Sequence, residues 1–349
     1  MEHFISGAVI DTRTEEEKAK DKRITELVAS LDQVNWVEKP QSAWRKFPIF
    51  QQNGSGSCVY QTISKMKGIF YWLKNQVYVH FSATHGYQRR ANRPGTGMGA
   101  VDAFNIAKQG TTLEELVPSQ NMNDAQMDSI IIPQYKQDVG KVFAVGEPIF
   151  LPVQDIEAVA SVIQKTGKAV MVWFYFGMNE WNQAVPQIVD PALGLIGAPG
   201  LHSVTAVDFT LYQGKKALII EDSWGAGVGI NGQRVITEDF YKVRNWFAGY
   251  FMNFKFEEQT MPKPIHTFTT ELKYGDENYS VKMLQEILKY EGLFPINTTS
   301  TGKYYGTTAE SVLKFQRKYA VAPESELTML AGMRVGPKTI AKLNELYSQ

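Results

Sequence analysis

Residues 52–58 read Gln-Asn-Gly-Ser-Gly-Ser-Cys and lead without a break into VYQTISKMKGIFYWLKN, residues 59–75. Apolar residues recur along the second stretch with the 3.6-residue period of a helix. They are Val59, Ile63, Met66, Ile69, Phe70 and Leu73. A Gly/Ser loop followed directly by this period predicts that Cys58 begins a helix.

Cys58 is the single cysteine among 349 residues, which excludes an internal disulfide and a thiolate metal cluster. It is then a buried apolar side chain, a surface thiol or a nucleophile. The first turn of a helix favours a thiolate, because its N–H groups are unpaired and the helix dipole is positive there. Gly54 and Gly56 allow a substrate to approach closely, and the Cys58 amide and the Gln52 side chain can stabilise a developing oxyanion.

A thiolate nucleophile also requires a base that can protonate the leaving amine, which is a typical role of histidine. Of the five histidines we favour His202, because it begins a predicted strand and its ring is held at the end of a sheet. Asp222 ends the neighbouring predicted strand and can orient the imidazole, which raises the pKa of His202. Trp224 follows two residues later and can shield the hydrogen bond between them.

Length and composition predict about two domains, since roughly 150 residues per domain is typical and 44% of the residues are hydrophobic. Residues 1–33 form an N-terminal extension with an amphipathic helix over 15–31, and residues 34–50 form an extended segment. Two helical periods precede four strand-like runs, which cover 168–176, 201–212, 215–224 and 232–241. This order predicts an α+β domain over 34–256.

A polar segment with two prolines, residues 257–267, predicts a linker. Three helical stretches follow it, at 279–292, 307–320 and 336–347. Residues 268–349 are therefore expected to form a small all-α domain of three helices.

The motif that ends at Cys58 resembles the oxyanion-glutamine and nucleophile-cysteine motif of papain-like cysteine peptidases, and Leu201–Val204 resembles their base motif. Glu221–Gly225 is similar to their Asn-Ser-Trp-Gly motif, and residues 34–36 or 43–45 are similar to the aromatic segment at the start of the mature enzymes. The spacing from the cysteine to the histidine also fits the range of about 130–150 residues for papain-type enzymes.

The resemblance implies a helical half plus an antiparallel sheet half, in which Cys58 attacks, His202 transfers the proton and Asp222 orients His202. It also implies that Gln52 helps to hold the oxyanion and that Trp224 shields the pair. Two positions depart from the family pattern: Val59 replaces an aromatic residue, and Asp222 replaces the asparagine.

The loop 93–99 resembles the glycine pair that lines the substrate cleft in this family, with Gly97 at the matching place, although a plain turn is the alternative. Transglutaminases and arylamine acetyltransferases also use Cys, His and Asp. Gln52 and the Ser-Trp-Gly run favour a peptidase over both.

The C-terminal domain resembles the peptidoglycan-binding domain of many cell-wall hydrolases. The resemblance rests on Val281–Gln285, Leu288, Gly292–Phe294, Thr301–Gly306, Thr308, Phe315–Gln316, Val335–Thr339 and Leu343–Asn344. Most of these residues fit helix cores and helix starts. Tyr304 and Tyr305 lie on a predicted turn, where they can stack on sugars or pack in the core.

Together the resemblances imply a cysteine endopeptidase with a Cys-His-Asp triad that is targeted to the bacterial cell wall, such as a phage lysin or a virion-associated enzyme. Peptidoglycan and a peptide or protein substrate are the expected partners. Two alternatives stay open: a wall-anchored protease that cleaves proteins, and a non-catalytic structural or adhesion protein. By its position, the extension 1–33 is a candidate inhibitory pro-segment.

Charge and hydropathy exclude other partners. The 36 basic residues balance 36 acidic ones, so there is no excess of positive charge that would bind nucleic acid. The longest apolar stretches, such as 169–176, are too short for membrane insertion. The first residues lack a Sec-type signal, so we expect synthesis in the cytoplasm and action at the wall after release or within a virion. No cofactor is expected, because the GxGxxG run at 227–232 precedes a predicted strand rather than a helix, and no metal is expected, because a single cysteine excludes a thiolate metal cluster.

Overall fold

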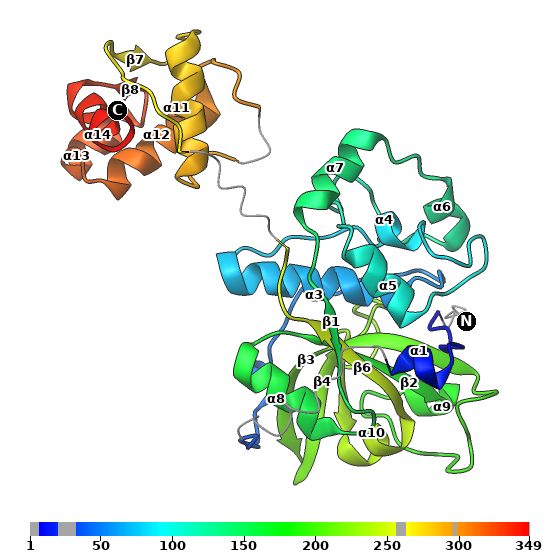
Figure 1. Ribbon diagram of the computed structural model, residues 1–349. Helices are drawn as coiled ribbons and strands as arrows, with labels where there is room; N and C mark the ends of the chain where they lie inside the picture. The colour runs from blue at the N-terminus through cyan, green and yellow to red at the C-terminus, as the bar shows by residue number, and fades with distance from the viewer. Residues whose placement is uncertain (1–6, 20–32, 256–262, 296–298, 349) are drawn as a thin grey trace. The chain divides into compact units, whose positions relative to one another are not determined.

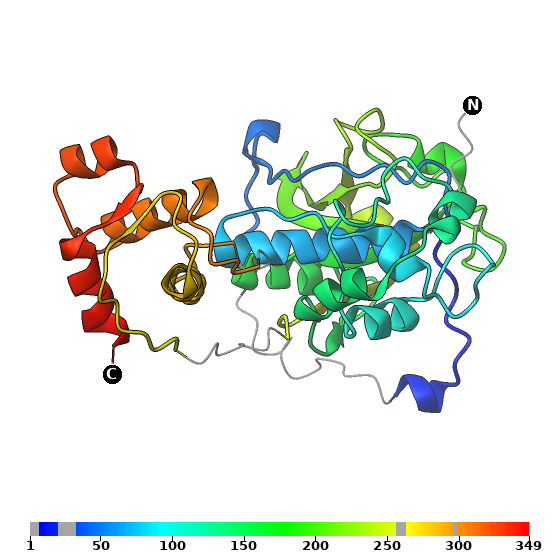
Figure 2. The ribbon, with the colours of Figure 1, turned by 90° about the horizontal axis from the view of Figure 1, so that it is seen from above.

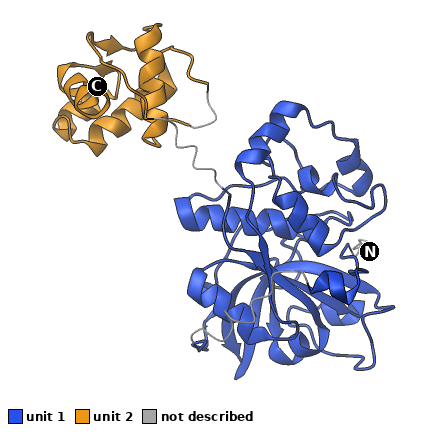
Figure 3. Ribbon diagram, in the orientation of Figure 1, with its two compact units in different colours: residues 1–256 blue, residues 257–349 orange. Residues whose placement is uncertain are grey.

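The computed structural model describes four stretches of the chain: residues 7–19, 33–255, 263–295 and 299–348. The chain divides into two compact units, residues 1–256 and 257–349, each with its own hydrophobic core (Figure 3). No helix in these stretches has both the length and the apolar composition that a bilayer crossing requires.

Helix α3, Cys58–Asn75, is the central helix of the first unit. Its residues 58–69 are all buried, because the sheet covers one side and the helices α4, α5, α6 and α7 lie on the other (Figures 1 and 2). These helices span Ala83–Tyr87, Ala100–Ala107, Asp124–Ser129 and Gln134–Val142. The prediction that Cys58 begins a helix is confirmed.

The sheet of the first unit has six antiparallel strands in the order β1-β6-β2-β3-β4-β5. In chain order they are Pro148–Phe150, Val170–Phe176, Gly200–Tyr212, Lys215–Glu221, Gln233–Thr237 and Asn245–Phe251. Strands β3 and β4 form a hairpin whose turn residues Gln213 and Gly214 both have positive φ, as a tight two-residue hairpin requires. Three short helices border the sheet: α8 (Ile156–Thr166), α9 (Met178–Trp181) and α10 (Glu238–Arg244).

Three of the four predicted strands are confirmed to within a few residues, but the prediction for 232–241 is wrong after Thr237. Residues 238–241 belong to α10. Thr237 has the extended backbone of an N-cap, and Glu238 and Asp239 place negative charge in the first turn, where the helix dipole favours it. These helix-start signals outweigh the aromatic, strand-like composition.

The segment 34–50 runs along the sheet in irregular backbone, interrupted by a short 3₁₀ turn, η1, at Gln41–Ala43. The N–H of Leu211 donates to the Val37 carbonyl at 2.9 Å, and the N–H of Arg45 donates to Asp208 at 3.0 Å. Of the predicted helix over 15–31, the structure describes α1, Glu15–Lys18, with Thr14 in a capping box. Residues 20–32 lie outside the described stretches.

The second unit contains four helices in its described residues: α11 (Tyr279–Tyr290), α12 (Gly306–Lys318), α13 (Glu324–Leu330) and α14 (Pro337–Tyr347). The three predicted helices correspond to α11, α12 and α14. Sequence analysis missed α13, because Leu327 is its single buried residue, and missed the two-stranded pairing of β7 (Leu272–Lys273) with β8 (Arg334–Val335). The predicted linker is described only from residue 263, where its backbone is irregular and the His266 N–H already donates to Tyr347.

Two buried glutamines explain part of the C-terminal motif. The Gln285 amide donates to the Lys303 carbonyl at 3.0 Å and to Thr308 at 2.9 Å. The corresponding bonds recur in the next helix, where Gln316 donates to the Arg334 carbonyl and to Thr339. The Gln and Thr positions of the motif therefore stabilise the fold by satisfying buried polar groups.

A buried ion pair joins α3 to the sheet. The Lys65 ammonium lies 2.8 Å from Glu221, and both side chains are almost fully buried. Burial lowers the pKa of Lys65, and the carboxylate of Glu221 opposes this effect. Glu221 also accepts a hydrogen bond from the Phe47 N–H at 2.8 Å, so one carboxylate ties together the helix, the sheet and the segment 34–50.

We expect Lys65→Met to lower the free energy of unfolding by about 3 kcal/mol or more, because it leaves the Glu221 carboxylate buried without its counter-ion. Denaturant unfolding at neutral pH measures this change. Lys215→Met is the control, since it removes one partner of an exposed pair with Asp239 and should change the stability little. Equal effects of the two variants would contradict this role of the buried pair.

Candidate active site

Three glycine backbones meet beside Cys58. A Cβ atom on Gly7 would overlap the Gly56 carbonyl, one on Gly56 would lie 2.6 Å from the Gly97 nitrogen, and one on Gly97 would lie 2.7 Å from the Gly7 oxygen. The Asp124 carboxylate joins the two loops, because it accepts from the Gly56 N–H at 2.9 Å and from the Thr96 hydroxyl at 2.8 Å. The absence of side chains at all three positions is what allows this close packing.

The structure brings His202 and Asp222 together, as the hairpin of β3 and β4 predicts. Nε2 of His202 lies 2.8 Å from Oδ1 of Asp222, and both side chains are fully buried. Nδ1 is the other ring nitrogen, and it has no ordinary hydrogen bond to any described residue. Cys58 is close enough to raise the pKa of His202, so we infer that Nδ1 faces the thiol.

The second carboxylate oxygen of Asp222 has two donors that sequence analysis missed. Oδ2 accepts from Nε1 of Trp181, in α9, and from Nε of Arg234, in β5, both at 3.1 Å. Arg234 stood in a predicted strand and Trp181 in a segment with no assigned element. Neither belongs to one of the motifs assigned to the site, so only the sheet register and the α9 turn reveal them.

Neighbouring charges decide the ionisation of the pair. Burial by itself raises the pKa of Asp222, but His202 and Arg234 outweigh burial and hold this pKa well below its usual range. Burial lowers the pKa of His202, but Asp222 and Cys58 outweigh that effect and raise it to about 9. The pair is therefore an imidazolium and a carboxylate at neutral pH, which agrees with the effect expected of an acidic partner.

Gln52 contacts the residue that follows Asp222, and Trp224 contacts His202. The Gln52 amide donates to the Ser55 carbonyl at 2.6 Å and accepts from the Ser223 hydroxyl at 2.6 Å, which ties the loop before Cys58 to the residue after Asp222. The Trp224 ring lies 4.6 Å from the His202 ring, centre to centre, and is almost fully buried. It covers one face of the imidazole.

The N-terminal stretch of the first unit crosses this site. The Ala8 N–H donates to the carbonyl of Leu201, the residue before His202, at 3.2 Å. The Met98 N–H donates to the Gly7 carbonyl at 2.9 Å, and the Val9 N–H donates to the Met98 carbonyl at 3.1 Å, in a parallel bridge. The predicted cleft residue Gly97 thus touches this stretch, but Met98 makes the backbone pairing. Cys58 is completely buried in this arrangement.

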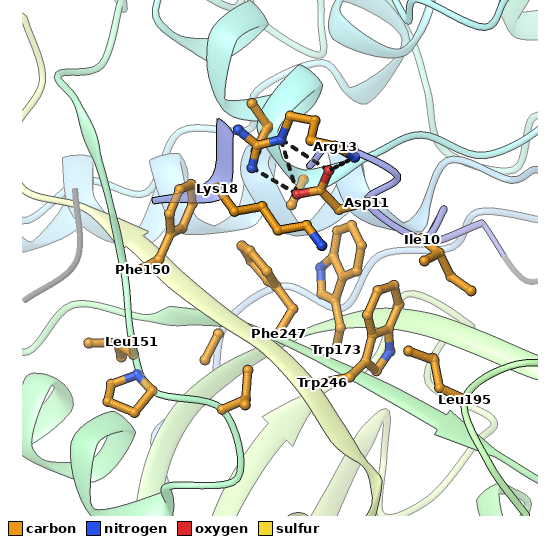
Figure 4. A pocket seen from close by; sticks show the side chains of 15 residues that line it. Ile10, Asp11, Arg13, Lys18, Phe150, Leu151, Trp173, Leu195, Trp246 and Phe247 are labelled. Carbon is orange, nitrogen blue, oxygen red and sulfur yellow. Dashed lines mark hydrogen bonds and ion pairs between the residues drawn. The ribbon is translucent and has the colours of Figure 1, made fainter. Parts of the chain in front are cut away.

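A pocket of about 480 Å³ lies next to the N-terminal stretch, just after the residues that cross the site (Figure 4). Trp173, Trp246 and Phe247 form an aromatic wall from β2 and β6, and Arg13 and Asp11, from the N-terminal stretch, form an ion pair at its edge. Ala100, which begins α5, also lines the pocket. Its walls are mostly apolar, with charged groups at the side formed by the N-terminal stretch.

The remaining histidines have other surroundings. His85 is buried in α4, accepts from the Thr112 N–H at 3.3 Å, and has its pKa lowered to about 3 by burial and by nearby Arg89 and Lys67. His80 packs against Phe50, and His266 lies in the second unit. Within the stretches the structure describes, no three His, Cys, Asp or Glu side chains gather as metal ligands. His3 lies outside them.

The raised pKa of His202 predicts a pH-dependent stability. Because the folded pKa is about 9 and the ordinary value is 6.5, the pair stabilises the fold fully below pH 6.5, and this contribution is lost as the pH rises through 9. We expect Asp222→Asn to remove most of this decline in the free energy of unfolding between pH 6 and pH 10. Asp239→Asn, in an exposed pair, is the control. A decline of unchanged size in Asp222→Asn would contradict this assignment.

Comparison with known protein structures identifies the fold. No protein-family model and no curated protein match the sequence. Xylellain, a cysteine protease from Xylella fastidiosa, matches with 15% identity and a TM-score of 0.58 over 72% of this chain and 96% of its own. A procathepsin B from Trypanosoma congolense (14% identity, TM-score 0.52, 72% of this chain and 86% of its own) is also similar. So is procathepsin L2 from Tenebrio molitor larval midgut (17% identity, TM-score 0.51, 71% and 78%). The chain therefore contains the predicted α+β fold of the papain-like cysteine proteases.

Proposed function

We propose that this protein is a cysteine endopeptidase in which Cys58 is the nucleophile, His202 the general base and acid, and Asp222 the residue that orients His202. Gln52 and the Cys58 amide stabilise the oxyanion. The observation that carries this proposal is the buried His202–Asp222 pair beside the first turn of α3, on a papain-like fold. A thiol nucleophile requires a base, which His202 provides, and a group that orients the base, which Asp222 provides.

The reaction follows from these positions. The thiol proton resides on Nδ1 of the His202 imidazolium, and the Cys58 sulfur attacks the carbonyl carbon of the scissile bond. The carbonyl oxygen becomes an oxyanion, which the Gln52 side-chain amide and the Cys58 backbone N–H stabilise. The C–N bond then breaks, and the amine leaves with the proton from Nδ1. Water, activated by His202, hydrolyses the thioester and releases the acid and the thiol.

We assign the 480 Å³ pocket to a substrate side chain. Ile10 lines it, and Ile10 directly follows the stretch 7–9 that pairs with the Met98 backbone. In this proposal, a peptide that replaces the stretch at that edge places a side chain beside Trp246 and Phe247. Aromatic walls favour a large apolar side chain, because its transfer from water stabilises the complex.

The stretch 7–10 keeps the enzyme latent in this proposal, in agreement with the pro-segment hypothesis. It uses the backbone groups of Met98 and Leu201 that a substrate would need, and it lies against Gly56, two residues before the nucleophile. Activation requires its displacement.

The second unit, in this proposal, binds peptidoglycan and raises the local concentration of wall substrate. The motif at residues 281–344 supports this assignment. Tyr304 is a core residue whose hydroxyl donates to the Gly332 carbonyl, so it cannot stack on a sugar. Tyr305 is 44% exposed and packs edge-on against Tyr274 at 5.6 Å, which offers aromatic surface to a glycan. A phage lysin or virion-associated enzyme that acts at the wall fits both units.

A pair of gels tests the substrate. We expect the full chain to clear a zymogram of purified sacculi slowly and to clear it faster after deletion of residues 1–33, and Cys58→Ala to leave the gel intact while still sedimenting with sacculi. Because Cys58 is the only cysteine, an epoxide thiol inhibitor should label the wild type alone. Clearing of casein but not of sacculi would indicate a protease of proteins. Absence of labelling and of clearing, also after deletion of residues 1–33, would leave only a structural or adhesion role.

Gly7→Ala tests latency with one methyl group. The added Cβ would overlap the Gly56 carbonyl, so the stretch must shift away from the site, and we expect a several-fold faster hydrolysis and labelling of Cys58. Gly227→Ala is the control, because no atom lies within 4 Å of the added Cβ there. An activity of Gly7→Ala equal to that of the wild type, together with unchanged activity after deletion of residues 1–33, would contradict latency.

A further inference from the structure

We propose that Arg234 is a positioning residue of this site: its guanidinium fixes the Asp222 carboxylate in the orientation and charge state in which it serves His202. The inference deepens the proposed function, since it assigns a further residue to the same site. Arg234 touches neither the substrate position nor the thiol in this proposal and acts through Asp222.

The guanidinium is held firmly from several sides. Arg234 lies in β5 opposite Ile220 of β4, and its side chain is 1% exposed. Its Nε donates to Oδ2 of Asp222 at 3.1 Å, and its Nη1 donates to the Gln183 carbonyl at 2.7 Å. The same group lies 5.2 Å from the Trp181 ring centre. Burying a guanidinium beside a carboxylate costs solvation free energy. This cost is offset only when the hydrogen bonds of both groups have good geometry.

The hydrogen-bond pattern explains why residue 222 is an aspartate. Oδ1 must accept from Nε2 of His202, and Oδ2 accepts from two donors, Trp181 and Arg234. An asparagine with its oxygen toward His202 would turn its NH₂ group toward these two N–H donors. Only a carboxylate offers an acceptor on both sides. Aspartate in place of the family's asparagine is therefore explained by the presence of Arg234, which requires an acceptor at this position.

Charge gives Arg234 a second effect. The titratable and charged groups around the pair are Cys58 and Lys65 from α3, Glu221 from β4 and Arg234 from β5. Lys65 and Glu221 form their own ion pair, so Arg234 is the cation besides His202 that, among the described residues, bonds directly to Asp222. A carboxylate without this cation would hold the imidazolium proton more tightly. Arg234 therefore limits the basicity of His202, which favours release of the proton to a leaving amine.

Arg244 provides a matched control. Its guanidinium is also fully buried and binds Glu180 through two hydrogen bonds, at 3.0 and 2.7 Å. Glu180 precedes Trp181 in α9, but the other hydrogen bonds of Arg244 go to the carbonyls of Leu193 and Asp190 and not to Asp222. A purely structural role for a buried arginine would appear in both variants, whereas an effect on the charge of the pair should appear at Arg234 alone.

The experiment is an NMR titration of the histidine imidazoles in the full-length protein. The His202 signal is assigned by its loss in His202→Gln. We expect a midpoint near pH 9 in the wild type and an increase of about 1 unit in Arg234→Met, the size typical of a nearby opposite charge. Arg234→Gln, which keeps an N–H donor without the charge, should show the same increase if the Met variant does not fold. Arg234→Lys and Arg244→Met should stay near the wild type.

An unchanged midpoint in folded Arg234→Met or Arg234→Gln would overturn the inference, and so would an equal shift in Arg244→Met. The titration needs no substrate, so its result is independent of the gels that test hydrolysis. A silent Cys58 with the expected titration would refute the proposed function and leave the Arg234–Asp222–His202 relation intact. An active Cys58 with an unshifted midpoint would do the reverse.

Discussion

The carboxylate of Asp222 is a buried charge, and much of the first unit is arranged to keep it ionised. A buried carboxylate with unsatisfied oxygens would take up a proton or destabilise the fold. Here Oδ1 accepts from His202 in β3, and Oδ2 accepts from Arg234 in β5 and from Trp181 in α9. Asp222 itself follows β4. The order of three adjacent strands and the position of one short helix are therefore all required by a single carboxylate.

Two further buried ion pairs hold the groups that surround this carboxylate. Glu180 accepts two bonds from Arg244 and others from the N–H groups of Gly177, Val189 and Asp190, which stabilises the loop that follows α9. Lys65 and Glu221 fix α3 against β4, one residue from Asp222. Each ion pair is costly to bury, and removing one of its partners is strongly destabilising. Both pairs therefore stabilise the part of the fold that surrounds Asp222.

The parts of the site that the sequence predicts are those carried by local motifs. A glycine-rich loop before a helical period indicates Cys58, and a hairpin of two strand patterns brings His202 beside Asp222. Trp181 and Arg234 could not be predicted, because their contacts depend on sheet register and on a turn without sequence signature. The same limit applies to α13, whose one buried leucine gives no period, and to Tyr304, whose burial depends on packing between distant segments.

The meeting of Gly7, Gly56 and Gly97 follows from the same need for close backbone approach that substrate binding imposes. In the proposed function a peptide backbone passes close to the thiol, and the lack of side chains at Gly56 and Gly97 allows that close approach. Any glycine-containing stretch of the chain that reaches this cleft can then occupy it, and Gly7 does so with bonds to Met98 and Leu201. Under the proposed function, substrate access and self-occlusion depend on the same two glycines, so a side chain at either position would disturb both.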